Sequence, residues 1–380
     1  MGSRQAVDAF GASTGSRRET IEFMIKKTAY GVGTLGTVIA LAMRFLDADP
    51  MLTFSLSALT ILGLAFTLGH ATEQLGIAAG PRIGGLLNAT VGNVGEIIIA
   101  GFLINAGEIE VVHATITGSI IGNLLLVVGA SLLVGGLKNG VQEYDSQVTG
   151  MNAASLILAT IGLIVPATFA LLIGATPATG PGEPGFFRVE ALTIGVASLL
   201  LVTYCAQVVF YLRSPESATA PIEHETAEWS GRTALAVLLG SAAALTAVSE
   251  VLVHTLEPAV EALGVSRLFV GIILIPVIGN LAEHVVGITL AYKNKMDFSL
   301  LTSLGSATQI ALFAVPVLVF LGLILGKPLT LVFTPLEVVA VAVSVFIASY
   351  IALDGKSNWV EGLQLTSVYV MLGLAFFFLT

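Results

Sequence analysis

The sequence predicts an all-α polytopic membrane protein with eleven transmembrane helices, and three observations carry that prediction. The 380 residues are 55% hydrophobic and only 11% charged, whereas a soluble domain carries about 25% charged residues. Apolar runs of roughly twenty residues, the length that crosses a bilayer, recur along the whole chain. Two stretches of the chain also repeat each other at a fixed offset that keeps costly polar residues in register.

Composition also excludes several functional classes. A formal net charge of −9 and the lack of a long Lys/Arg run exclude a basic nucleic-acid binder. The single cysteine, Cys205, excludes an internal disulfide and a thiolate metal cluster. The low charge and high hydrophobicity exclude a disordered chain.

The expected helices follow apolar runs that are bounded by polar, Pro or Gly clusters. The first run is rich in glycine (YGVGTLGTV) and gives the weakest pattern. The helices are expected at residues 28–45, 51–72, 87–106, 111–136, 149–174, 187–212, 233–254, 267–291, 298–324, 330–352 and 360–379.

The distribution of basic residues predicts the orientation in the membrane. With the N-terminus in the cytoplasm, twelve of the 16 lysines and arginines fall on the cytoplasmic side and four on the other. This bias follows the positive-inside rule, and an odd number of spans then places the C-terminus outside. The topology predicts a prokaryotic inner membrane, with a vacuolar membrane as the alternative.

An internal repeat links the third and eighth expected helices. They contain LNATVGNVGEIIIA and LIPVIGNLAEHVVG, and both hold Gly-Asn-x-x-Glu. Chance matches between apolar runs explain repeated leucines, but not a Glu, an Asn and a Ser in register. The matched pairs, each 187 residues apart, are Gly92/Gly279, Asn93/Asn280, Glu96/Glu283, Thr115/Thr302, Gly118/Gly305 and Ser119/Ser306.

The repeat extends backward with one gap. ATEQL around Glu73 resembles VSEVL around Glu250 at an offset of 177, so the second copy has ten extra residues around LEPAVEALG. Each copy then holds five helices, and an odd number forces the two copies to insert in opposite directions. Inverted repeats are typical of secondary transporters, which bind substrate between the repeats near the midplane. An old duplication retained for packing is the alternative.

These features predict four segments of chain. Residues 1–50 form an N-terminal segment with the first helix, 51–213 the first five-helix repeat, 214–232 an acidic cytoplasmic linker and 233–380 the second, inverted repeat. The linker is interpreted as a solvated spacer, or else as a sensor of divalent cations.

Glu96 and Glu283 are the candidate functional residues. An ionisable side chain inside a membrane helix is costly and indicates a functional site, and neither helix contains a Lys or Arg to pair with it. Two such carboxylates must share protons, bind a cation or alternate between the two. A buried, neutral, hydrogen-bonded carboxyl is the alternative for each.

The polar residues around this pair suit a hard cation, because Ca²⁺ takes 6–8 oxygen ligands. Asn93 and Asn280 can supply amide oxygens or orient the carboxylates, or else serve as interhelical hydrogen-bond partners. Gly92, Gly279 and Pro276 can interrupt their helices and free backbone carbonyls, and the two glycines can instead, or also, serve close packing. Hydroxyls and amides on the fourth and ninth helices can complete the site, although the serines also suit close packing: Ser119, Asn123, Ser306 and Gln309.

Three further polar residues keep two interpretations each. His284 follows Glu283 and either modulates proton binding or hydrogen-bonds a neighbour. Glu73 and Glu250 are either interfacial carboxylates or part of a route for protons or cations.

GNVGE and GNLAEH, followed by GSIIGN and GSATQI, resemble the two repeat motifs of the calcium/proton antiporter (cation/proton exchanger) family. The resemblance covers nearly the whole chain. It implies that Glu96 and Glu283 bind Ca²⁺ and protons, and that Asn93, Asn280, Ser306 and Gln309 support them. Sodium/calcium exchangers typically carry proline before the glutamate, whereas Gly95 and Ala282 stand here, which favours H⁺ over Na⁺.

One departure from the family pattern concerns the fourth helix. The family often has GSxxSN there, and Gly122 replaces the second serine, which puts a hydroxyl near Asn123 in doubt.

The resemblance implies a secondary active antiporter that exports Ca²⁺ from the cytosol in exchange for H⁺ by alternating access. It implies Ca²⁺, H⁺ and the lipid bilayer as partners, with no enzymatic activity and no cofactor. A homo-oligomer is compatible with the sequence. The alternatives are a sodium-coupled or broader cation exchanger on the same scaffold and, further away, an intramembrane hydrolase with paired carboxylates.

Overall fold

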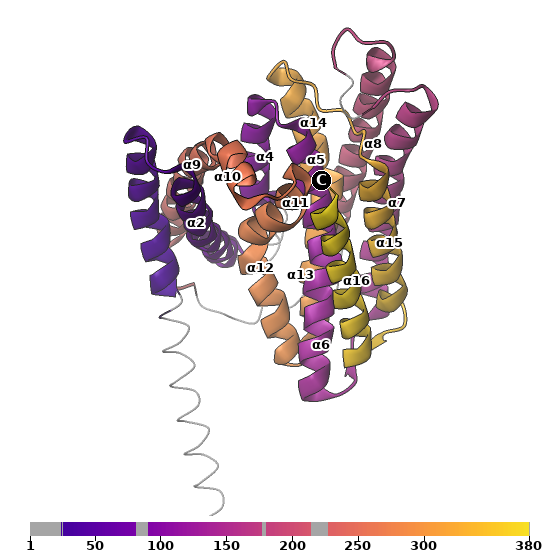
Figure 1. The fold of residues 1–380 in the computed structure, drawn as a ribbon. Coiled ribbons are helices and arrows are strands. Elements are labelled where there is room, and N and C mark those ends of the chain that lie inside the picture. The colour runs from indigo at the N-terminus through magenta and orange to yellow at the C-terminus, as the bar shows by residue number, and fades with distance from the viewer. Residues whose placement is uncertain (1–23, 25, 81–89, 177–179, 214–226, 380) are drawn as a thin grey trace, which may run out of the picture.

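The computed structural model describes residue 24 and residues 26–80, 90–176, 180–213 and 227–379. The described chain is a bundle of helices, as expected, with one antiparallel ladder in which Gln142 pairs with Ser357 and Glu143 with Lys356. In Figure 1 the first helix, α2, α9 and α10 lie on one side, α7 and α8 on the opposite side, and α12, α13 and α5–α6 between them.

Each expected helix has a helical counterpart in the structure. The first, at residues 26–45, is followed by the remaining elements, which are α2 (Pro50–Ala79), α4 (Val94–Ala106), α5 (Ile109–Ile121), η1 (Gly122–Val127), α6 (Val128–Asn139), β1 (Gln142–Glu143), α7 (Ser146–Leu172), α8 (Phe186–Arg213), α9 (Gly231–His254), α10 (Leu256–Leu263), α11 (Arg267–Phe269), η3 (Val270–Leu274), α12 (Ile275–Tyr292), α13 (Met296–Gln309), η4 (Ile310–Ala314), α14 (Val315–Ile324), α15 (Pro335–Ala352), β2 (Lys356–Ser357) and α16 (Trp359–Phe378).

The number of membrane crossings stays a prediction. Among the described residues, eight helices are long and apolar enough to cross a membrane, or nine when the bent pair α10 and α11–α12 counts as one. α4 is apolar but has only 13 residues. The four-segment division also stays a prediction, and residues 1–23, 81–89 and 214–226, which include most of the acidic linker, lie outside the described residues.

Two expected helix boundaries were wrong. The helix expected from residue 330 begins at Pro335, because Thr334 and Glu337 form a capping box and proline favours the first helical turn. α2 continues past residue 72 to Ala79 and ends at Gly80, whose φ of 88° suits glycine.

The core consists of two equivalent rods, one from each repeat. Residues 109–139 run through α5, η1 and α6, and residues 296–324 run through α13, η4 and α14. Their apolar windows are 72% and 61% buried, against 22% for α8 and for α16. The two rods therefore lie inside the bundle, whereas α8 and α16 present most of their surface outward.

Glycines allow α5 and η3 to cross at close range. A Cβ on Gly118 would collide with the Ile272 carbonyl and the Pro276 ring, and one on Gly271 would lie 2.5 Å from the Ala114 Cβ. Small residues at such crossings are typical of helix packing in membranes. This crossing brings α5 of the first repeat against α12 of the second.

Two glycines of the first helix, Gly33 and Gly36, also lie at a close helix contact. The first helix packs against α2 where a Cβ on Gly63 would lie 2.7 Å from the Gly33 nitrogen. The first helix therefore belongs to the bundle and contacts the first repeat through α2.

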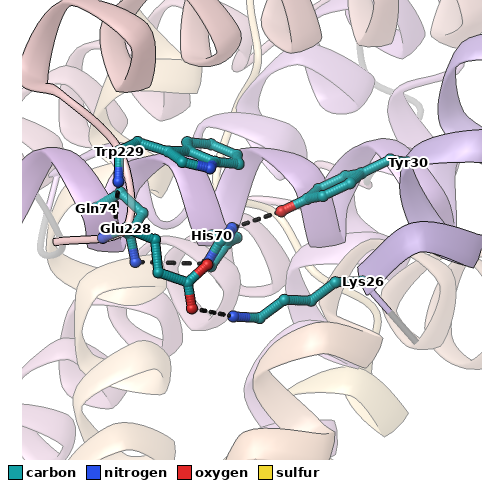
Figure 2. A network of polar contacts seen from close by, with 6 residues as sticks. All are labelled: Lys26, Tyr30, His70, Gln74, Glu228 and Trp229. Carbon is teal, nitrogen blue, oxygen red and sulfur yellow. Dashed lines mark hydrogen bonds and ion pairs between the residues drawn. The ribbon is translucent and has the colours of Figure 1, made fainter. Parts of the chain in front are cut away.

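The described end of the linker docks on the cytoplasmic ends that we predict for these two helices (Figure 2). Lys26 on the first helix pairs with Glu228 at 2.8 Å. The Gln74 Oε1 accepts from the backbone N–H groups of Glu228 and Trp229, at 2.7 and 3.3 Å. The linker end is thus held by one ion pair and by two backbone hydrogen bonds.

His70 on α2 lies at the centre of the same network. Its Nδ1 is 2.6 Å from the Tyr30 hydroxyl, and its ring meets the Trp229 ring edge-on at 4.8 Å between centroids. Its Nε2 is 3.9 Å from a Glu228 carboxylate oxygen. The network joins the first helix, α2 and the linker through aromatic as well as charged contacts.

We expect Gly118→Ala to destabilise the protein, because the added methyl group has no room at the α5–η3 crossing and overpacking costs about 1–3 kcal/mol. Thermal unfolding in detergent measures the effect. Gly305→Ala, at the matching repeat position, is the control, since a Cβ there meets nothing within 4 Å among the described residues. Equal melting temperatures for the two variants would contradict the tight crossing.

We expect the stabilising effect of Glu228 to depend on pH. The hydrogen bond from Lys26 lowers the pKa of the Glu228 carboxyl below its usual value, and the charge of His70 acts in the same direction. A lowered pKa adds stability above the usual value of 4.5, and this stability is lost as pH falls through the lowered pKa. Melting curves of the wild type and Glu228→Gln should therefore differ at pH 7 and converge in acid.

The exposed Glu261→Gln is the control for this effect. A difference in melting temperature between the wild type and Glu228→Gln that stays constant across the pH range would exclude an ionic contribution from Glu228.

Candidate functional site

Glu96 lies in the first turn of a helix that begins inside the bundle. Residues 90 and 91 are helical, Gly92 and Asn93 form a turn, and α4 starts at Val94. The turn confirms the expected interruption at Gly92. It places the Glu96 carboxylate next to free backbone N–H groups and the positive end of the helix dipole.

The partner segment of the second repeat is built differently. η3 is a π-helical stretch that leads directly into α12, where Pro276 occupies the first turn. Gly279 does not interrupt α12, so of the two roles open to this glycine, a helix break or close packing, the structure has the close packing. The missing side chain lets Glu96 approach, since a Cβ on Gly279 would lie 3.9 Å from the Glu96 Cγ.

Glu96 receives two hydrogen bonds on one oxygen, from different repeats. The Ser119 hydroxyl on α5 donates to the Glu96 Oε1 at 2.5 Å. The Asn280 amide on α12 donates to the same oxygen at 2.6 Å. Asn280 and Ser119 are 5% and 2% exposed, so these contacts lie inside the protein. The carboxylate of one repeat is therefore oriented by an amide of the other.

The second carboxylate has a related but unequal environment. The Ser306 hydroxyl on α13 hydrogen-bonds with Glu283, as Ser119 does with Glu96. The Asn93 amide, however, donates to the Gln309 Oε1 at 2.9 Å, although the repeat relation would direct it to Glu283. The two halves of the cluster thus share a serine contact and differ in the asparagine contact.

A further amide closes the cluster between the two core rods. The Asn123 Nδ2 donates to the Ser306 Oγ at 3.2 Å and to the Ser119 carbonyl at 3.0 Å. The structure therefore brings together eight of the expected residues, all of them from the segments that repeat: Asn93, Glu96, Ser119, Asn123, Asn280, Glu283, Ser306 and Gln309.

Three enclosed oxygens of this cluster have no hydrogen-bond partner: Glu96 Oε2, Glu283 Oε2 and Asn93 Oδ1. Burial of an acceptor without a partner costs free energy. A carboxylate oxygen and an amide oxygen are ligands of a hard cation, and a carboxylate oxygen also takes a proton. Glu96 and Glu283 are also near enough to interact electrostatically.

The oxygen ligands of this cluster do not suit a soft metal ion. Within the described ranges, no group of three or more His, Cys, Asp or Glu side chains could hold a metal ion. A cation here would be bound by two carboxylates together with amide, hydroxyl or backbone oxygens, which is the chemistry of Ca²⁺ and similar ions.

The remaining expected residues lie around this cluster. His284 is 5% exposed, and its Nε2 is enclosed without a partner. Glu73 on α2 and Glu250 on α9 have exposed side chains, and Glu73 acts electrostatically on Tyr30. Their roles stay predictions.

Two features of the site have no signal in the sequence pattern. η1 and η4 are π-helical segments that follow Ser119 and Ser306, at positions that the repeat offset relates. π-segments occur at functional sites, where they change the direction of the side chains that follow. Leu245 on α9 is fully buried and packs at the start of α4, 3.4 Å from the position of a Cβ on Gly95.

Comparison with known proteins gives consistent matches. The sodium/calcium exchanger protein family matches residues 50–213 and 233–378. A Ca²⁺/H⁺ antiporter of Aphanothece halophytica is 42% identical over 373 residues, which are 93% of this chain and 98% of that protein. The Ca²⁺/H⁺ antiporter ChaA of Bacillus subtilis (strain 168) is 40% identical over 86% of this chain and 92% of its own.

Solved structures share the fold. Native YfkE has a TM-score of 0.78 and 35% identity over 92% of this chain and 100% of its own. The H⁺/Ca²⁺ exchanger CAX has a TM-score of 0.68 over 94% of this chain and 93% of its own, and at 15% identity it supports the fold alone.

We expect Asn280→Ala to weaken binding of a divalent cation about tenfold, which is near the lower end of the contribution of a hydrogen bond to a charged group. The variant leaves Ser119 as the donor that orients Glu96. Calorimetric titration of the purified protein with Ca²⁺ measures the change. Asn152→Ala, a buried asparagine on α7, is the control, and unchanged affinity in Asn280→Ala would show that the amide does not prepare the site.

Proposed function

The chain belongs to the sodium/calcium exchanger protein family, and we propose that it is a secondary active antiporter that exports Ca²⁺ from the cytosol in exchange for H⁺. The relatives of highest identity given above are named Ca²⁺/H⁺ antiporters. Homologues from bacteria and cyanobacteria support an inner-membrane location for this multi-pass protein.

The observation that carries the proposal is the set of three enclosed acceptor oxygens on Glu96, Glu283 and Asn93. Their hydrogen-bonding neighbours are neutral hydroxyls and amides. Neutral donors orient a carboxylate but do not balance its charge. The balance has to come from a bound cation or from protons, and these are the two ions of the proposed exchange.

Competition for the same oxygens couples the two fluxes. Facing the cytosol, the ionised carboxylates of Glu96 and Glu283 bind Ca²⁺. On the other side, where the proton concentration is higher, protonation removes the negative charge that holds Ca²⁺, and the ion leaves. The change of access from one face to the other costs little when the site is protonated or holds Ca²⁺, whereas it is costly when two buried carboxylates are ionised and empty. The empty, ionised site therefore does not return, and neither ion moves without the other.

The inverted repeats supply the change of access. The cluster lies between α4–α5 of the first repeat and α12–α13 of the second, where transporters with inverted repeats bind substrate. The unequal hydrogen bonds of Asn93 and Asn280 support two alternative arrangements, one related to the other by exchange of the repeats.

We expect Glu96→Gln and Glu283→Gln each to abolish Ca²⁺ uptake into inverted vesicles with an imposed pH gradient. Each substitution keeps the side-chain shape but removes the ionisable group, so Ca²⁺ loses a charged ligand and H⁺ its binding site. Glu337→Gln is the matched control, because Glu337 is also buried in a membrane helix but is held by the Thr334 cap and lies 3.5 Å from Thr117.

Two outcomes would contradict the proposal. Uptake that survives either glutamine substitution would remove the carboxylate pair from the mechanism. Uptake that follows a Na⁺ gradient and ignores pH would favour a sodium-coupled exchanger on the same scaffold.

A further inference from the structure

The extra residues of the second repeat form a separate helix at one end of the bundle. α10 covers Leu256–Leu263 and ends at Gly264, whose φ of 63° is left-handed. It meets the helix that begins at Arg267 at an angle of 111°. α10 packs against α2 and α9, and the orientation predicted from the basic residues places it on the extracytoplasmic face.

Arg267, the first residue of α11, makes two ion pairs across this bend. Its Nη1 donates to the Glu108 Oε2 at 3.0 Å, and its Nη2 donates to the Glu257 Oε1 at 2.6 Å. Glu108 is the N-cap residue of α5 in the first repeat, and Glu257 lies on α10. One guanidinium therefore joins three segments: the α4–α5 turn, α10 and the start of α11.

The α5–η3 crossing lies directly beneath these ion pairs. Along α5, Glu108 is followed by Val111, whose side chain contacts the crossing at Gly271, and then by Gly118 and Ser119. At 1.5 Å per residue, Ser119 is about 16 Å below Glu108. The ion pairs and the crossing therefore lie between the extracytoplasmic face and the Glu96 cluster.

The geometry favours an energetic role over an incidental surface contact. Isolated exposed ion pairs contribute little, but a guanidinium that binds two carboxylates with separate nitrogens is held in a defined orientation. Glu108 is 23% exposed and Arg267 is 40% exposed, so the pair between the repeats is partly shielded from water. Glu257 comes from the insertion, which has no counterpart in the first repeat.

We propose that Arg267, Glu108 and Glu257 form a clamp that keeps the extracytoplasmic route to the Glu96 cluster closed. The inference rests on the proposed alternating access and adds the contact that biases it. Because the insertion occurs in one repeat, the clamp acts at one face, and it favours the state in which the cluster is reached from the cytosol. Release of Ca²⁺ to the outside then requires the clamp to open.

The test is the accessibility of a cysteine beneath the clamp. Val111→Cys is introduced into a Cys205→Ser background, since Val111 is fully buried at the crossing and cysteine is no larger than valine. Membrane-impermeant maleimide is added to right-side-out and to inverted vesicles. We expect Arg267→Gln and Glu257→Gln each to raise labelling from the extracytoplasmic side about fivefold, the effect of losing one ion pair at the upper end of its usual strength.

Two further variants make the result specific. Arg44→Gln is the matched control, because Arg44 is an arginine on the same predicted face with a 3.9 Å contact to Asp47 in its own segment. Arg267→Lys keeps a positive charge between Glu108 and Glu257 and is expected to keep labelling slower than in Arg267→Gln. Glu257 is 64% exposed, so its substitution tests the clamp even if Arg267→Gln does not fold.

Labelling that is the same in Glu257→Gln, Arg44→Gln and the parent would overturn the clamp, as would faster labelling from the cytoplasmic side. Labelling does not require transport, so this result is independent of the vesicle uptake assay. If Ca²⁺ uptake survives Glu96→Gln or Glu283→Gln while the clamp variants still change labelling, the proposed function is refuted and the closure stays in place.

Discussion

The structure depends on one electrostatic constraint, which is that two carboxylates inside an apolar bundle need positive charge. Glu96 uses one oxygen to accept from Ser119 and Asn280, and its other oxygen is enclosed without a partner. Because hydroxyl and amide donors carry no net charge, they orient the carboxylate and leave its charge unbalanced. Transfer of such a group from water to an apolar interior is costly. The free energy of the site therefore depends on whichever mobile ion occupies it, and this dependence is the physical basis of the exchange that we propose.

The internal repeat brings Glu96 and Glu283 into one cluster, but their surroundings are unequal. Glycines at 118 and 271 let α5 approach η3, so that residues of both repeats reach one cluster. Yet Asn280 contacts Glu96 while Asn93 contacts Gln309, and Gly122 occupies the repeat position that matches Gln309. A rearrangement of the repeats can exchange the environments of two related but unequal half-sites. Two identical half-sites with the same contacts would give no difference in energy between access from one face and access from the other.

The sequence was sufficient for the helices, the repeat and the polar residues of the cluster, because hydrophobic length and misplaced charge are strong signals in a membrane protein. The sequence was insufficient for the helix breaks, the π-helical segments and one helix start, because backbone geometry and packing determine these features. The turn at Gly92–Asn93 was expected, but Gly279 stays helical, because glycine permits a break without requiring one. The π-segments η1 and η4 depend on how α5 and α13 pack, which no local pattern records. The start of α15 at Pro335 was readable from Thr334 and Glu337, yet the apolar run alone suggested an earlier start.

The charges at the two ends of the bundle have a different energetic role from those at its centre. Lys26 with Glu228 and Arg267 with Glu257 are partly exposed, so water can replace each partner at modest cost. Contacts of that strength do not determine the fold, but they are large enough to change the populations of two states that differ by a few kcal/mol. In the proposed mechanism the carboxylates of Glu96 and Glu283 select the ions, and the ion pairs at the ends of the bundle bias which side those ions come from. A transporter needs both levels, because a site that binds strongly in one conformation alone would hold its ion and not release it.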